Sequence, residues 1–508
     1  MEADHSQHQS ASQQDLNNNS SEKLPSRSRT IRNKQRRLLI SLCLIILWLT
    51  IVMIYQTHKP LPPGLSMEGP VHHVKDVEFL YDLTYKKPVL PIQETMIFDR
   101  VFQVIDEAEQ FIVIDMFLFN SYYKEGTLYT PLSGLLTEKL LEQKKRHPTM
   151  PIIFITDEVN TMYGSAMPPE LERLKAGGID VVISDVNPLR DSIPSYSAFW
   201  RTFVQWFGQT GKGWLPNPMV DTAPSMSVRS YLKLVNVKAN HRKVIATERA
   251  LIVPSANAHD ASAYNSNSAF LVRGDIIADA LASEQAVIAF SRGSEDEFHF
   301  PQYIPDVKEE GDIEVQLLTE GKIHKHVLQS LSEAGVGDRG WMGMFYLADR
   351  QVIKALIGAS KRGAELRLIL DSNQNAFGRD KIGIPNRPVA KELLDASDNR
   401  IQIRWYNGTD EQYHTKLLFI DKTNRIMVNN GSANFTERNL DDLNLETNLG
   451  LNAPGDSRLA LQLRQYFNRL WNNEGAPYTL DYEAFKDKTV WIKDWMYRLQ
   501  EWLGLTTF

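Results

Sequence analysis

The sequence predicts an α/β fold made of two similar halves around one shared active-site cleft, preceded by a single transmembrane helix. Three observations lead to this prediction. An uncharged apolar run covers residues 38–55, buried strands alternate with helical stretches in the same order twice, and His-x-Lys occurs at His241 and again at His414. Alternating strands and helices are typical of mainly parallel or mixed sheets covered on both faces. Two equivalent halves packed face to face would bring the two motifs together.

The composition is that of a globular protein, with 43% hydrophobic and 23% charged residues among 508. The net charge is −6, but residues 1–37 carry +3, so the rest of the chain carries −9. An acidic body argues against a nucleic-acid-binding protein, although a local basic groove can hide in such a sum. The single cysteine, Cys43, excludes a disulfide framework and a thiolate zinc cluster.

The apolar run over residues 38–55 is long enough to cross a hydrocarbon layer of ~30 Å. A buried core helix would show a polar face, and a cleavable signal peptide would be followed by a small-x-small site. Neither feature is present, so we expect an uncleaved, single-pass anchor in the cell membrane. Four basic residues precede the run: Arg32, Lys34, Arg36 and Arg37. The positive-inside rule then predicts a cytoplasmic, disordered segment over 1–37 and an extracytoplasmic catalytic body.

A stiff spacer over 56–74 is expected after the anchor, because Pro60, Pro62, Pro63 and Gly64 favour extended chain. The first half then covers 75–300, with strands at 111–119, 152–157 and 181–185 and helices at about 131–145 and 168–176. The second half covers 301–475, with strands at 342–347, 366–371 and 401–406 and helices at 349–361 and from about 388. The same order in both halves predicts an internal repeat.

The first half contains an insertion over about 187–230. The motif at His241 follows Asp157 by 84 positions, whereas His414 follows Asp371 by only 43. The extra residues include six aromatic side chains: Phe199, Trp200, Phe203, Trp206, Phe207 and Trp214. Such a segment is an unusual loop, and either a local mini-core or a lid or apolar wall for a lipid tail would explain it.

The two motifs have matching neighbours. His414 and Lys416 are followed by Asp421, Gly431, Ser432, Asn434 and Glu446, and a strand is expected over 417–420. His241 and Lys243 are followed by Glu248, Pro254, Ser255, Asn257 and Asn267. Side chains two apart on a strand point the same way, so each His-Lys pair can face one bound phosphate. A lone His-x-Lys is common, but two copies with the same downstream Ser-Ala-Asn predict a phosphate-handling site.

This pattern resembles the phospholipase D superfamily, whose motif is His-x-Lys-x4-Asp with a downstream Gly-Ser-x-Asn, present twice. The resemblance covers most of residues 75–475. Within the superfamily, the chain resembles membrane-anchored bacterial proteins that are similar to phospholipase D or to cardiolipin synthase. The second copy follows the family pattern at every motif position. The first copy departs twice, because Glu248 stands where Asp is usual and Pro254 where Gly is usual.

The resemblance implies a covalent mechanism. One histidine attacks phosphorus to form a phosphohistidine, and the other protonates the leaving alkoxide and then deprotonates the incoming water or alcohol. The family order makes His241 the nucleophile and His414 the acid/base. The catalytic set is His241, Lys243, Glu248, His414, Lys416 and Asp421. Residues expected to bind phosphate or orient the histidines are Ser255, Asn257, Asn267, Ser432, Asn434 and Glu446, with Asn267 and Glu446 the candidates for fixing the histidine tautomers.

No metal and no cofactor is expected, because two lysines supply the positive charge. Zinc ligation by the histidines is the alternative, and neighbouring lysines would repel a cation. Phospholipid is the expected substrate, with water or an alcohol as acceptor, so the function is phospholipase D hydrolysis or cardiolipin-synthase-like phosphatidyl transfer. The alternatives are a membrane-anchored nuclease of the same superfamily, which would have nucleic acid as its partner, and a catalytically silent binding protein.

The C-terminal segment over 476–508 is aromatic and amphipathic. One helical stripe contains Trp491, Ile492, Trp495, Met496, Leu499, Trp502 and Leu503. This spacing predicts either a helix at the membrane interface or a terminal helix docked on the body.

Overall fold

The computed structural model describes residues 27–85, 92–124, 126, 129–209, 211–292, 300–304, 310–376, 379–408, 411–486 and 490–502. The chain separates into two compact units, Met1–Val52 and Met53–Phe508. Most of the segment expected to be disordered, residues 1–26, lies outside the described residues, and residues 27–37 are helical instead.

The apolar run forms part of helix α1 (Arg27–His58). Among the described residues, one helical stretch, Ile31–His58, is long and apolar enough to cross a membrane, and none of its apolar window is buried in protein. The stretch lies near the N-terminus, and a signal sequence at such a place would meet the same criteria of length and apolar composition. It is therefore a candidate membrane span.

The first half of the body forms an eight-stranded mixed sheet in the order β3-β2-β9-β8-β7-β4-β5-β6. Its strands are β2 (Glu78–Tyr85), β3 (Ile92–Glu94), β4 (Ile112–Met116), β5 (Ile152–Asp157), β6 (Asp180–Ser184), β7 (Lys243–Thr247), β8 (Leu251–Pro254) and β9 (Asn267–Val272). β4, β5 and β6 are parallel, and β7 joins β4 antiparallel. Parallel strands need helical crossovers, which α3 (Leu132–Arg146) and α4 (Pro169–Ala176) provide.

The second half repeats this order in a nine-stranded sheet, β1-β10-β18-β17-β16-β11-β12-β15-β19. Its strands are β1 (His72–Val74), β10 (Ile313–Thr319), β11 (Arg339–Met344), β12 (Glu365–Leu370), β15 (Gln402–Tyr406), β16 (Lys416–Asp421), β17 (Arg425–Gly431), β18 (Thr447–Pro454) and β19 (Thr479–Asp481). β18-β17-β16-β11-β12-β15 corresponds strand for strand to β9-β8-β7-β4-β5-β6. The predicted fold class, with its internal repeat, is confirmed.

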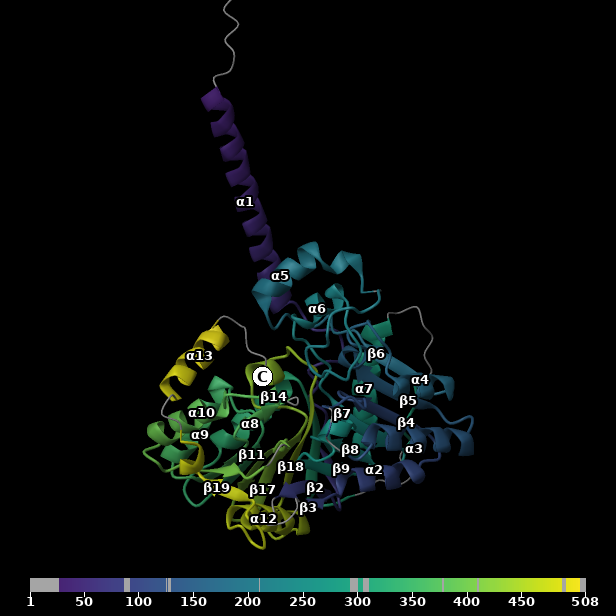
Figure 1. The fold of residues 1–508 in the computed structure, drawn as a ribbon. Helices are drawn as coiled ribbons and strands as arrows, with labels where there is room; N and C mark the ends of the chain where they lie inside the picture. The colour runs from purple at the N-terminus through teal and green to yellow at the C-terminus, as the bar shows by residue number, and fades with distance from the viewer. Residues whose placement is uncertain are drawn as a thin grey trace, which may run out of the picture. The chain divides into compact units, whose positions relative to one another are not determined.

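The two sheets share a central core, because alternate residues of each strand point to opposite faces. Val113 of β4 packs in a cluster with Trp341 and Phe419 of the second sheet and with α7 (Ile276–Arg292) and α12 (Arg458–Trp471). Its neighbours in β4 pack on the other face, against α2 (Ile97–Asp106), α3 and α4 (Figure 1). Helices α8 (Gly321–Ser332), α9 (Arg350–Lys361) and α10 (Asn386–Ala396) cover the outer face of the second sheet.

The expected spacer over 56–74 is partly wrong. β1 pairs with β10, Glu68 forms a bridge with Leu318, and Met67 N donates to Thr319 Oγ1 at 2.7 Å. This segment therefore belongs to the second sheet. It does so because Val74 is a buried apolar residue that completes the edge of the sheet.

The C-terminal segment also joins the second half. β19 pairs with β15, and in α13 (Val490–Trp502) the buried Tyr497 donates its hydroxyl hydrogen to Ala348 O at 2.7 Å. Three members of the predicted apolar stripe, Ile492, Trp495 and Leu499, are exposed. The helix is thus docked through Tyr497, outside the predicted stripe. Leu503 lies outside the described residues.

The insertion contains α5 (Pro194–Phe203) and α6 (Val228–Leu234), which lie together at one end of the body (Figure 1). A small core does exist, in which Met226 packs against Val159 and Met162. The aromatic residues do not build it. Of the six, only Trp200 is buried, and the other five are 44% to 75% exposed.

Candidate active site

The two histidines lie at the junction between the halves, just before the equivalent strands β7 and β16. His241 N donates to Leu445 O at 2.9 Å, and Leu445 N donates back to Ala239 O at 3.0 Å. The equivalent segments also pair, since Ser266 N donates to Gln412 O at 2.9 Å. Each histidine segment is therefore held by the opposite half, which brings both motifs into one site.

The side-chain partner of each histidine also comes from the opposite half. His241 Nδ1 lies 2.8 Å from Glu446 Oε1, and His414 Nδ1 lies 3.1 Å from Asn267 Oδ1. The Nδ2 group of Asn267 donates to Asn265 O at 2.9 Å, which identifies Oδ1 as an acceptor. A carboxylate and an amide oxygen both accept hydrogen bonds, so these contacts favour the tautomer with the proton on Nδ1 and the lone pair on Nε2. Glu446 is ionisable and Asn267 is not, which makes the two histidines chemically different.

Lys243 and Lys416 occupy equivalent positions. Each Nζ donates to the carbonyl of its own histidine, His241 O or His414 O, at 2.8 Å, and both side chains are fully buried. Burial lowers the pKa of Lys243 to about 7, although Glu446 opposes the shift. Burial, followed by the charge of Lys243, lowers the pKa of Lys416 well below its usual value. Both lysines therefore lose their protons more readily than exposed lysines do.

The same electrostatic coupling includes the histidines. Burial and the charges of Lys243 and Lys416 lower the pKa of His241 and of His414 well below the ordinary value. Burial raises the pKa of Glu446 to about 7, against the opposing effect of Lys243. Neutral imidazoles beside two buried lysines form a site that would receive an anion, whose charge would favour the protonated form of each lysine.

The other orienting residues form matched pairs. Ser432 Oγ donates to Glu446, and Ser255 Oγ donates to Asn267 Oδ1 at 3.1 Å. Each serine therefore fixes the partner of one histidine. Asn257 Oδ1 accepts from Leu118 N at 3.3 Å, whereas the buried Asn434 Oδ1 has no partner among the described residues.

Glu248 and Asp421 do not join this cluster, so the expectation that they act in catalysis is corrected. β16 begins at Lys416 and ends at Asp421, and a rise of ~3.3 Å per residue puts these Cα atoms roughly 17 Å apart. Asp421 instead accepts two hydrogen bonds from Arg464, at 2.8 and 2.6 Å. Glu248 follows the end of β7 and accepts from Glu109 N at 2.8 Å. Both carboxylates stabilise the fold at the far ends of their strands.

Two buried aspartates were missed in the sequence. Asp157 Oδ2 accepts from Asn240 N at 2.7 Å, and Asp371 Oδ2 accepts from Tyr413 N at 2.8 Å. Each therefore holds the residue that precedes a histidine. Burial raises the pKa of Asp157 to about 7 and that of Asp371 to about 6. The available signal was the aspartate that ends the second repeated strand in both halves.

Two aromatic rings that flank the histidines were also missed. The Phe117 ring lies 4.6 Å from the His241 ring, and the Phe345 ring lies 5.1 Å from the His414 ring. Each ring also faces its lysine, with Nζ to centroid distances of 5.0 and 5.4 Å. The signal that could have indicated them was the repeated Met-Phe pair, in which Met ends β4 or β11 and Phe follows it.

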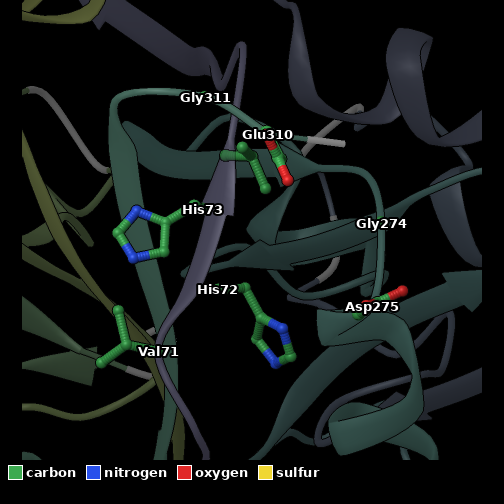
Figure 2. Close-up of a pocket in the computed structure, with 8 residues that line it drawn as sticks. Val71, His72, His73, Gly274, Asp275, Glu310 and Gly311 are labelled. Atoms are coloured by element: carbon green, nitrogen blue, oxygen red, sulfur yellow. The ribbon is translucent and has the colours of Figure 1, made fainter. Parts of the chain in front are cut away.

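Two other polar features lie outside this cluster. His324 contacts Asp349 and Asp441 through its two ring nitrogens, at 3.1 and 2.9 Å. Burial lowers the pKa of His324, but these hydrogen bonds outweigh it and raise the pKa to about 9. The two carboxylates therefore favour the protonated form of the ring. Figure 2 shows a pocket lined by His72, His73 and Glu310. This pocket shares no residue with the site of His241 and His414.

Comparison with known proteins gives a family for part of the chain. Residues 327–471 match the family model described as cardiolipin synthase, PLD-like domain, in which PLD stands for phospholipase D. None of the curated proteins matches the chain.

Solved structures give the fold. Phosphatidylserine synthase from Haemophilus influenzae Rd KW20 is similar with a TM-score of 0.57 and 10% identity, over 86% of this chain and 97% of that chain. Polyphosphate kinase from Porphyromonas gingivalis gives a TM-score of 0.38 and 11% identity, over 85% of this chain and 56% of that chain. Nuc from Salmonella typhimurium, a phospholipase D family member, gives 0.25 and 21% identity, over 34% of this chain and 98% of that chain.

Of these three structures, the phosphatidylserine synthase alone exceeds a TM-score of 0.5 and thus shows the fold. The resemblance to the phospholipase D superfamily stated from the motifs is confirmed. Residues 327–471 thus match the phospholipase D-like family model, within a chain that has a fold like that of a phosphatidylserine synthase.

Proposed function

We propose that this chain breaks the phosphodiester of a phospholipid through a phosphohistidine and passes the phosphatidyl group to water or an alcohol. The observation that carries the proposal is the pair of buried histidines, each oriented from the opposite half and each accompanied by a buried lysine. A buried site with two oriented imidazoles and two lysines has the groups that in-line phosphoryl transfer needs.

In the proposed mechanism His241 is the nucleophile. Its Nε2 lone pair attacks phosphorus, the bond to the leaving alkoxide breaks, and the alkoxide takes a proton from His414. His414 then removes a proton from the acceptor, whose oxygen attacks phosphorus and releases His241. The Glu446 carboxylate stabilises the positive charge that the His241 ring gains on attack, as in other oriented histidine systems.

The neutral partner of His414 suits the acid/base role. Asn267 orients the ring without stabilising its cation, so protonated His414 gives up its proton more readily than His241 would. An anionic substrate raises the pKa of His414 and supplies the charge that keeps it protonated before attack. Lys243, Lys416, Asn257 and Asn434 are the groups proposed to hold the non-bridging oxygens.

Lipid is the proposed substrate because three features favour it over nucleic acid. The chain has a candidate membrane span, its body is acidic, and the description of the matching family model names a phospholipid synthase. We also propose that the span is an uncleaved anchor with the body outside the cytoplasm, and that the two halves cover about 75–300 and 301–475.

The test uses the purified full-length chain in vesicles of phosphatidylcholine and phosphatidylglycerol, with glycerol as acceptor. The expected products are phosphatidic acid and a transferred phosphatidyl lipid, and both should disappear in His241→Ala and His414→Ala. The same preparations are incubated with labelled single-stranded DNA. Degradation of DNA without lipid turnover would favour the nuclease, and lipid turnover retained by both variants would refute the shared site.

A further inference from the structure

Five aromatic side chains of the insertion point away from the protein. Together Phe199, Phe203, Trp206, Phe207 and Trp214 are called the aromatic surface, and their exposed fractions are 46%, 44%, 75%, 68% and 71%. Single exposed apolar residues are ordinary, but five large exposed aromatic rings within residues 199–214 are a mark of an interaction surface. Tryptophan in particular is enriched where protein meets the polar region of a bilayer.

The aromatic surface is held outward by the residues beneath it. On α5, Phe199 and Phe203 are one turn apart with ring centroids 5.3 Å from each other, while the intervening Trp200 and Arg201 are buried. Arg201 Nη2 lies 2.7 Å from Asp191 Oδ1, which fixes the inner side of the helix. The exposure of Phe199 and Phe203 is therefore built into the packing of α5.

The base of the insertion is bonded to the end of the candidate span. Asp191 N donates to Gln56 O at 3.2 Å, and Arg190 Nε donates to Lys59 O at 2.9 Å. Gln56 belongs to the candidate span, Ile31–His58, and Lys59 follows it directly. With the candidate span in a bilayer, a segment bonded to its last turn would lie near the membrane surface.

The charge of the insertion suits a lipid surface. The insertion over 187–230 contains four basic residues, Arg190, Arg201, Lys212 and Arg229, and two acidic ones, Asp191 and Asp221, in a chain with a net charge of −6. Lys212 is exposed, close in sequence to Trp206 and Trp214. Exposed aromatic rings near a lysine, in a segment with a positive net charge, match the combination that anionic bilayers attract.

We propose that the aromatic surface docks into the headgroup region of a phospholipid bilayer and sets the height of the catalytic site above it. The insertion also reaches the site, because its Met226 packs in one small core with Val159 and Phe117, and the Phe117 ring lies 4.6 Å from the His241 ring. The role of docking in turnover rests on the proposed function. The docking itself does not.

Docking is tested with one reporter per molecule, which the sequence allows because Cys43 is the only cysteine. In full-length Cys43→Ser, a single cysteine is placed by Trp206→Cys or, as control, by Val336→Cys, and is labelled with a polarity-sensitive fluorophore. Val336 is 88% exposed and lies in the second half, between α8 and β11. The vesicles contain equal amounts of phosphatidylcholine and phosphatidylglycerol, with nitroxide-labelled lipid as quencher.

The label at position 206 should shift to the blue and be quenched by the lipid nitroxide, while the label at 336 should remain aqueous. Equal, aqueous signals at both positions would overturn the proposal. In a second arm, Trp206→Ser with Phe207→Ser should lower turnover of vesicle lipid on the order of tenfold and leave a short-chain, monomeric phosphatidylcholine unaffected. Equal loss on both substrates would also overturn it.

The two proposals fail in distinguishable ways. If position 206 is quenched by lipid but no lipid is turned over, docking stands and the proposed function fails. If lipid is turned over in vesicles and position 206 stays aqueous, the proposed function stands and docking fails.

Discussion

His241 and His414 share one site, but a single difference in their partners separates their chemistry. Glu446 can carry a negative charge beside His241, and Asn267 cannot do so beside His414. A carboxylate stabilises an imidazolium that becomes covalently bonded, whereas an amide only holds the ring in place. At the scale of single residues, this asymmetry is the strongest support for His241 as nucleophile.

Glu446→Gln keeps the shape of the His241 partner and removes its charge. We expect kcat to fall on the order of a thousandfold, with little change in KM, because the charge acts only when the His241 ring becomes positive. Lipid turnover in vesicles measures the change. Glu248→Gln is the matched control and should retain activity, since Glu248 caps backbone N–H groups at the far end of β7. Equal losses in the two variants would contradict the assignment.

The pH dependence follows from two buried groups. Burial raises the pKa of Glu446 to about 7, so its carboxylate form is populated above that pH, and burial lowers the pKa of Lys243 to about 7, so its charged form is populated below it. Both required forms coexist only near neutrality. We expect a narrow bell-shaped profile of kcat/KM with its maximum near pH 7. In Glu446→Gln the acidic limb should weaken, and an unchanged limb would show that another group titrates there.

At the scale of elements, the sequence predicted the strands best. Residues 152–157 and 366–371 are buried apolar runs, and the structure places β5 and β12 there within one residue. The roles of Glu248 and Asp421 could not be read in this way. A strand pattern shows which side chains share a face but not which end of the strand reaches the site, so the family motif suggested catalysis where the structure shows capping and an ion pair.

The buried Arg242 joins elements of the two halves. Its Nη2 lies 2.7 Å from Glu320 Oε1, its Nη1 lies 3.3 Å from Glu284 Oε1, and all three side chains are buried. Arg242→Ala would leave two buried carboxylates without their cation, which costs about 3–5 kcal/mol of unfolding free energy. Urea unfolding of the full chain in detergent measures this loss.

Arg249→Ala is the matched control for that experiment. Arg249 is 46% exposed and pairs with Glu109 and with Glu248, and Glu248 keeps its backbone donors without it, so the loss of Arg249 should cost about 0–1 kcal/mol. An effect of Arg242→Ala as small as that of Arg249→Ala would show that the cluster does not bind the halves together.

At the scale of the whole molecule, the sequence predicted two halves and a shared site. It did not predict that the halves exchange partners, because Glu446 and His241 are 205 positions apart and no local pattern connects them. The sequence also did not show that the aromatic side chains of the insertion point outward. Aromatic composition alone is compatible with a core or a surface, and only the packing of Trp200 and Arg201 beneath them decides between the two.

One chain contains both histidines, so the site should be complete in a single molecule. Mixing His241→Ala with His414→Ala, in one detergent preparation, should therefore not restore lipid turnover. Activity approaching that of a diluted unmodified chain would contradict this expectation. Such a result would mean that sites form between chains through exchanged halves.

The central claim, a shared site in which His241 carries the phosphatidyl group, is tested most directly by trapping the covalent intermediate. The full chain is mixed with phosphorus-labelled phospholipid, quenched at alkaline pH to preserve phosphohistidine, and mapped by peptide mass spectrometry. The account predicts label on the peptide that contains His241, and none when His241 is replaced by Ala. Label on His414 in the unmodified chain would contradict it.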